Sequence, residues 1–167
     1  STRALSLSWI ALMLVASLGA AAPIAGDELQ RLASGEILAQ SIHEDKSGGA
    51  ARVTALFHAS AADIWNVIGY CKNEFVYVRG LELCEAVVPG PRYTKKHHRV
   101  KNNWYTPTID FVYDTRRLSS THSTFSLVEG NLKILEGHWD FQPAPGGGLV
   151  VRHEIRIRSK FPAPRWL

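Results

Sequence analysis

The chain has 167 residues, a formal net charge of +4, 46% hydrophobic residues and 20% charged residues. These values are ordinary for a single soluble globular domain with enough material for a core. Repeat architectures are excluded, because the sequence has no internal repeat and no low-complexity stretch beyond the Pro/Gly turn at residues 143–148.

The first predicted element is a secretory signal peptide. Arg3 precedes a short apolar run, Trp9–Ala16, and small residues follow it up to Ala22. The run is shorter than the ~20 apolar residues of a membrane span, although an uncleaved anchor is the alternative. We expect residues 1–25 to be the signal peptide, residues 26–167 to be the mature domain, and the protein to be periplasmic or secreted.

A hairpin follows in the mature chain. A short helical lead-in covers residues 27–33, and residues 36–44 alternate loosely as a strand. The polar and glycine-rich residues 45–49 predict a turn, and residues 51–58 return as the partner strand.

A capped helix interrupts the strands. Ser60 is a favourable N-cap, and Asp63 suits the positive start of a helix. Ile64 and Ile68 are one turn apart and therefore share a buried face, and Gly69 is a suitable stop.

The two cysteines flank a second short helical segment at residues 72–77. Cys71 precedes this segment, and Cys84 lies in the strand predicted at residues 81–88. Outside the cytoplasm two cysteines tend to pair, so we favour a disulfide over the alternative of two buried free thiols. No CxxC or other paired-ligand spacing indicates a metal site.

The second half of the chain alternates with the period of β-strands, in the segments 92–101, 108–118, 123–129, 132–142 and 149–160. Charged residues occupy one face of these strands, where cross-strand pairs form at a wet surface. Large apolar residues occupy the other face, which needs a cover. Pro162 and Pro164 end the last strand and suit the first turn of a further helix.

Charge is unevenly distributed along the chain. Acidic residues predominate from Gly26 to Pro91, and basic residues predominate from Arg92 to Leu167. The densest basic stretch is Arg92–Lys101, which suits contact with an anionic membrane or nucleic acid. The alternative, which we favour, is a solvated strand whose lysines discourage edge pairing. The export signal further disfavours nucleic acid.

Four segments resemble the START-like (SRPBCC) superfamily, in the group of polyketide cyclases and coenzyme Q-binding proteins. They are Ala59–Trp65, Val78–Glu85, Leu135–Phe141 and Pro162–Leu167. The resemblance implies an α+β helix-grip fold: a curved antiparallel sheet of about six or seven strands, short helices after the first strand, and a C-terminal grip helix of which this chain contains only the start. Such a domain would be incomplete at its C-terminus.

The resemblance also implies a hydrophobic cavity, and an apolar, ring-lined concave face suits an apolar ligand. Trp104 and Tyr105 lie in a loop where such a cavity would open, unless they belong to a packed loop. The candidate ligand-binding residues, whose alternative role is simple core packing, are Phe111, Tyr113, Phe125, Leu127, Leu135, Trp139, His153 and Ile155.

Catalytic signals are weak. None of the seven histidines forms an HxH or HExxH spacing, and no nucleophile elbow or phosphate loop is present. We therefore expect an exported carrier of a lipid, quinone or polyketide-like molecule, without cofactor or metal. The alternatives are a polyketide cyclase or dehydratase that uses His153 or Tyr113, and a module that binds another envelope protein.

Overall fold

The computed structural model of the protein describes residues 23–45 and 47–161. The main part of the expected signal peptide and the proline-containing residues 162–167 lie outside this range. Within the described residues the chain forms three helices and eight strands. The helices are α1 Gly26–Ala33, α2 Ala61–Gly69 and α3 Cys71–Tyr77. The strands are β1 Leu38–Asp45, β2 Gly48–Phe57, β3 Leu81–Val88, β4 Tyr93–Val100, β5 Ile109–Arg117, β6 His122–Gly130, β7 Leu132–Pro143 and β8 Leu149–Ser159.

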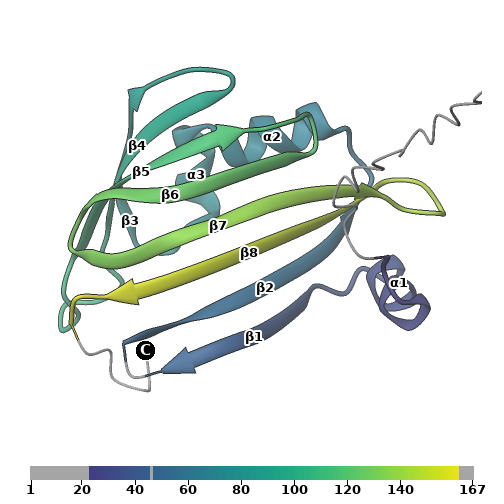
Figure 1. Cartoon of the computed structure of the whole chain (residues 1–167), viewed down its shortest axis with the longest axis horizontal. Coiled ribbons are helices and arrows are strands. Elements are labelled where there is room, and N and C mark those ends of the chain that lie inside the picture. The colour runs from purple at the N-terminus through teal and green to yellow at the C-terminus, as the bar shows by residue number, and fades with distance from the viewer. Residues whose placement is uncertain (1–22, 46, 162–167) are drawn as a thin grey trace, which may run out of the picture.

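All eight strands belong to one curved antiparallel sheet in the order β1-β2-β8-β7-β6-β5-β4-β3 (Figure 1). The early strand β2 pairs with the last strand β8, so that Ala51 lies opposite Ile155. The chain then passes from β2 to the far edge at β3 through α2 and α3. The eight strands correspond to the eight segments predicted from the sequence, one or two more than the number that the family resemblance implies, and β1 pairs with β2 in the predicted hairpin.

Helix α2 has the cap and the buried face that the sequence predicts. The Oγ atom of Ser60 accepts a hydrogen bond of 3.1 Å from the backbone N–H of Asp63. The Trp65 ring lies 4.3 Å from the Phe141 ring on β7, and its Nε1–H donates to the carbonyl of Ser120 at 2.7 Å. These contacts fasten α2 against the inner face of the sheet.

The inner face carries the predicted apolar residues, and glycine makes their packing possible. Phe111, Phe125, Leu132 and Leu135 form a buried cluster on β5, β6 and β7. A Cβ atom at Gly137 would lie 2.5 Å from the tip of the Phe125 ring, so only glycine leaves room for that ring.

The outer face carries charged cross-strand pairs. Arg156 donates to Glu136 at 3.1 Å, and Arg52 pairs with Glu154. Asp114 departs from the expected wet surface, because it is 8% exposed and accepts a hydrogen bond of 2.8 Å from Ser126.

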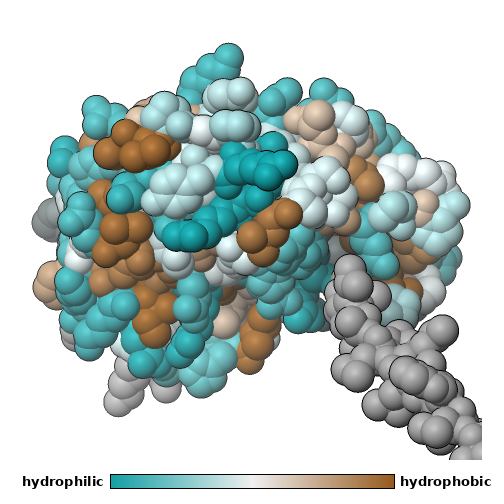
Figure 2. Space-filling model, turned by 45° about the horizontal axis from the view of Figure 1, so that its top comes forward, coloured by the Kyte–Doolittle hydropathy of each residue, from teal (hydrophilic) through white to brown (hydrophobic). Residues whose placement is uncertain are grey.

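Exposed apolar side chains form small groups among hydrophilic ones on the face seen in Figure 2. Among the described residues, no helix combines the length and apolar character that a bilayer crossing requires.

Candidate functional site

A cavity of about 800 Å³ lies between the inner face of the sheet and helices α2 and α3. Trp65 and Ile68 of α2 line it, as do Glu74 and Tyr77 of α3. Small-molecule sites typically have volumes of roughly 300–1,000 Å³, so the space suits a ligand of moderate size.

The wall formed by the sheet is largely apolar and aromatic. The predicted residues that line the cavity are Phe111, Tyr113, Phe125, Leu135, Trp139, His153 and Ile155. Leu127 is not among the lining residues; it packs against the buried cluster. The ligand-binding role of this set stays a prediction.

The loop between β4 and β5 lies beside the cavity, but its aromatic residues do not line it. Trp104 is 88% exposed, and its ring meets that of Tyr105 edge to face at 5.6 Å. Asn102, two residues earlier, does line the cavity. A role of Trp104 and Tyr105 at the mouth stays a prediction.

A disulfide fastens α3 to the sheet. Cys71, the first residue of α3, is bonded to Cys84 on β3, with the two Cα atoms 5.3 Å apart. Of the two alternatives for these cysteines, the structure therefore forms the bond. Glu74 follows Cys71 by one helical turn and so lies on the same side of α3, toward the strands.

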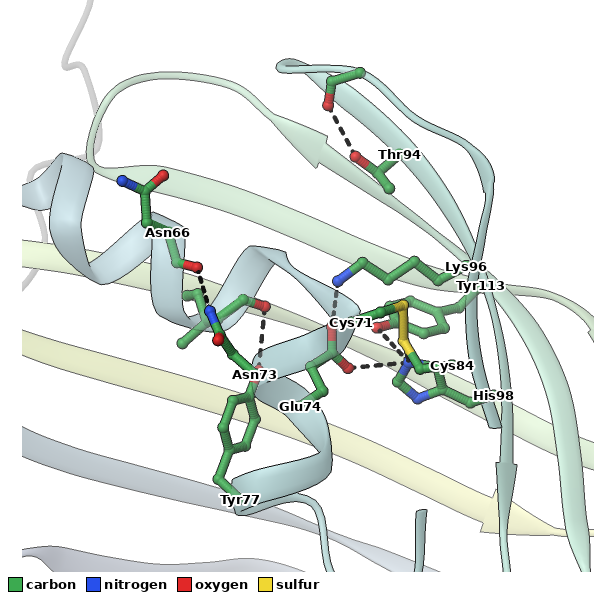
Figure 3. A network of polar contacts seen from close by, with 12 residues as sticks. Asn66, Cys71, Asn73, Glu74, Tyr77, Cys84, Thr94, Lys96, His98 and Tyr113 are labelled. Carbon is green, nitrogen blue, oxygen red and sulfur yellow. Dashed lines mark hydrogen bonds and ion pairs between the residues drawn. A yellow bond between two sulfur atoms is a disulfide. The ribbon is translucent and has the colours of Figure 1, made fainter. Parts of the chain in front are cut away.

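Glu74 is the centre of a buried charged cluster that lines the cavity (Figure 3). Glu74 is 3% exposed, and its partners Lys96 and His98 on β4 are 4% and 5% exposed. The Lys96 ammonium pairs with Glu74 Oε1, and His98 Nε2 lies 2.9 Å from Glu74 Oε2. Buried charges are expensive unless they are paired in this way.

The cluster keeps the Glu74 carboxyl ionised. Burial by itself raises the pKa of Glu74, but the hydrogen bond from His98 and the charge of Lys96 outweigh burial and lower that pKa below its ordinary value. Since a carboxylate only accepts hydrogen bonds, Nε2 of His98 carries the hydrogen that lies between the two groups.

Tyr113 adds a neutral hydroxyl to this wall. Its Oη atom lies 3.4 Å from His98 Nε2. Burial, together with the negative charge of Glu74, raises the pKa of Tyr113 well above its ordinary value. The phenol therefore stays protonated at neutral pH and is able to donate a hydrogen bond.

His153 supplies a second polar group on the sheet. Its ring stacks on Trp139 with the centroids 3.9 Å apart, and Nδ1–H donates to the carbonyl of His138 at 3.3 Å. Burial lowers the pKa of His153 to about 4. The imidazole is therefore neutral at pH 7, and Nε2 has no hydrogen-bond partner among the described residues.

Sequence reasoning missed the buried cluster because it treated Arg92–Lys101 as a solvated strand. In β4 the alternation turns Lys96 and His98 inward, and Arg99 is exposed. The signal that would have found the pair is the two-residue period itself, applied to charged residues as well as to apolar ones. Nothing in the local sequence of α3 marks Glu74 as buried.

The sequence of the chain matches a known protein family. The family described as "Polyketide cyclase / dehydrase and lipid transport" matches residues 58–167. The chain belongs to this family. The match begins just before α2 and includes every element that lines the cavity.

Solved structures share the fold of this chain. A STAR-related lipid transfer protein from Xanthomonas axonopodis (fragment 25–204) is 14% identical, with a TM-score of 0.63 over 78% of this chain and 81% of the other. The Zhui aromatase/cyclase from Streptomyces sp. R1128 is 11% identical, with a TM-score of 0.56 over 70% and 71%.

A START superfamily protein from Mycobacterium smegmatis is 13% identical, with a TM-score of 0.56 over 69% of this chain and 80% of the other. At these identities the likeness establishes the helix-grip fold and no more. The search of curated proteins gives no significant match.

Proposed function

We propose that the protein binds an apolar small molecule that carries one polar group, and that it acts as a carrier for a lipid, quinone or polyketide-like compound. The observation that carries this proposal is the pairing of a ring-lined wall with a buried charged cluster in one cavity of about 800 Å³. The apolar wall favours the body of such a ligand. The Tyr113 hydroxyl and the Lys96 ammonium suit a carbonyl or phenolic oxygen at its end.

The family membership supports this proposal, because the family description includes lipid transport. The structural neighbours include one protein named as a lipid transfer protein and one named as an aromatase/cyclase. Both names fit a cavity that admits a large, mostly apolar molecule.

The test is a solvent extract of the purified protein, followed by mass spectrometry and by titration with a short-chain quinone and a fluorescent fatty acid. A matched pair of variants sharpens it. Ile157 lines the cavity, whereas its neighbour Arg156 lies on the outer face. We expect Ile157→Trp to lose the extracted molecule and to weaken probe binding by roughly tenfold or more, because it fills the cavity.

The control variant Arg156→Trp is expected to bind as the unmodified protein does. Equal binding by both variants, or an empty extract with no probe binding, contradicts the proposal. Capture of a partner protein together with an empty cavity would favour the envelope module instead.

A cyclase or dehydratase is the second candidate, and the two neutral polar groups on the sheet favour it. Nε2 of His153, which no described residue contacts by a hydrogen bond, suits a weak general base, and the protonated Tyr113 suits a donor to a developing oxyanion. Turnover of a poly-β-keto substrate tests this function. His153→Ala would abolish turnover in an enzyme and would leave ligand binding intact in a carrier.

We also propose that the protein is exported, on the pattern of residues 1–25, and that it contacts anionic membranes. The support for membrane contact is the exposed Trp104 close to Lys101. N-terminal sequencing of the secreted protein tests export. Flotation with vesicles that contain or lack anionic lipid tests the contact, which would be lost in Trp104→Ser.

A further inference from the structure

The disulfide lies beside a carboxylate and an imidazole, two side-chain types that often act as metal ligands. The Sγ atoms of Cys71 and Cys84, Nε2 of His98 and a carboxylate oxygen of Glu74 all lie within 4.8 Å of one another (Figure 3). Cys84 Sγ is 3.2 Å from His98 Nε2, which is itself 2.9 Å from Glu74 Oε2. No linear spacing in the sequence indicates this set, because the fold assembles it.

Two rigid elements hold the four groups together. Cys71 and Glu74 are one turn apart on α3, and Cys84 lies directly opposite His98 in the ladder between β3 and β4. The positions of all four Cα atoms are therefore fixed by a helix and by a strand pair rather than by a loop. When the sulfur–sulfur bond is broken, the contacts of Glu74 with Lys96 and His98 still join α3 to β4, and the two Sγ atoms can separate by side-chain rotation to make room for an ion.

We propose that the disulfide is the oxidised form of a metal site, and that the reduced protein binds one zinc ion through Cys71, Cys84, His98 and Glu74. A dithiol reductant supplies two electrons and two protons, which break the sulfur–sulfur bond and give two thiols, while the reductant becomes its own disulfide. Zinc then takes the place of both thiol protons, which pass to solvent. Two thiolates, an imidazole and a carboxylate complete a tetrahedral shell.

The charges around the cluster suit the metal. A zinc ion with two thiolates and the Glu74 carboxylate has a net charge of −1, and the Lys96 ammonium beside Glu74 compensates it. His98 binds through the lone pair of Nε2, so the hydrogen on that atom passes to solvent and Nδ1 carries the ring hydrogen. In the disulfide form the sulfurs are neither charged nor free, so the oxidised protein lacks half of the ligand set.

The test uses the same chain in two redox states. Oxidised and reduced protein are titrated with zinc against a chromophoric chelator, and with cobalt(II) as a spectroscopic probe. We expect one equivalent to bind to the reduced protein, with thiolate-to-cobalt charge-transfer bands and the visible bands of a tetrahedral ion. The oxidised protein is expected to bind none at the same concentrations.

Adjacent histidines provide a matched control. His98→Gln is expected to weaken zinc binding by roughly 100-fold, because it removes a ligand. His97→Gln is expected to change it little, because His97 faces the other side of β4 and contacts Asp110. Equal affinity in both variants means that the thiols bind metal without the built site, and this result overturns the proposal.

The fold of the reduced protein is followed by near-ultraviolet circular dichroism. Where reduction lowers this signal, zinc is expected to restore it, since binding to the folded state alone stabilises that state. Failure of the reduced protein to bind zinc, failure to recover the signal, or equal binding by the oxidised protein also overturns the proposal. Ligand binding by the oxidised protein is measured separately and does not depend on the outcome.

Discussion

The two faces of the sheet both carry ion pairs, but in opposite surroundings. On the outer face Arg156 and Glu136 meet at 3.1 Å with about half of each side chain exposed. On the inner face Glu74, Lys96 and His98 meet with no more than 5% of each residue exposed. The outer pair keeps most of its water, whereas the inner cluster has lost nearly all of it.

The two sets of charges therefore differ in their desolvation free energy, which is small on the outer face and large on the inner face. Exposed pairs contribute about 0–1 kcal/mol each, because water and salt screen them. A buried pair recovers little more than its own desolvation, and an apolar replacement of similar shape is often as stable. Stability alone therefore does not account for the inner cluster, and its position in the cavity wall supports the ligand binding proposed above.

The largest expected effect comes from breaking the inner cluster. Glu74→Gln leaves the Lys96 ammonium buried without a counter-charge, so we expect the free energy of unfolding to fall by about 3–5 kcal/mol. Denaturant unfolding of the oxidised protein measures the change. Glu136→Gln on the outer face is the control. A similar, small loss in both variants would mean that water reaches Lys96 and that the two faces are alike.

The next effect depends on pH and concerns His153. Its pKa is about 4 in the folded protein, and an unfolded histidine has a pKa of about 6.5. The unfolded state therefore binds a proton first as the pH falls. This contribution to stability is complete above pH ~6.5 and is lost down to pH ~4, by about 2–3 kcal/mol.

Comparison of the protein with His153→Gln by unfolding at several pH values isolates this contribution, because the other titrating groups are common to both. We expect the difference in unfolding free energy between them to change between pH ~6.5 and pH ~4. The same change at the exposed His43, His43→Gln, serves as a control. A difference that stays constant across this range would show that His153 is solvated.

The smallest effect belongs to the outer face. Arg156→Gln removes the pair with Glu136, and we expect a loss below about 1 kcal/mol that shrinks further in high salt. Unfolding at low and high ionic strength measures it. A large, salt-independent loss would place this pair among the buried ones and would weaken the contrast between the faces.

The sequence predicts the fold well wherever a local rule applies. Ser60 and Gly69 mark the ends of α2, and the apolar alternation identifies the inner face, because caps and periodicity are properties of neighbouring residues. The expectation of export favours the pairing of Cys71 with Cys84, and the structure forms this bond.

The buried cluster could not be predicted, because it joins residues that are distant in the sequence and that usually remain exposed to solvent. Lys96 belongs to a basic stretch, and lysine and glutamate are rarely buried, so the strand looked solvated. Only the passage of α3 over β4 brings Glu74 to Lys96 and His98. Leu127 packs against the buried cluster and is not among the lining residues, because alternation gives the face of a residue but not its distance from the cavity.

The pairing of β2 with β8 has a consequence for biosynthesis. Ala51 finds its partner only when Ile155 has been made, so the β1–β2 hairpin stays separate from the rest of the sheet while most of the chain leaves the ribosome. Contacts between such distant segments form slowly, and β2 meanwhile presents an unpaired edge to other chains. The interval before β8 emerges is thus the period in which the nascent protein is most exposed to aggregation and most in need of a chaperone.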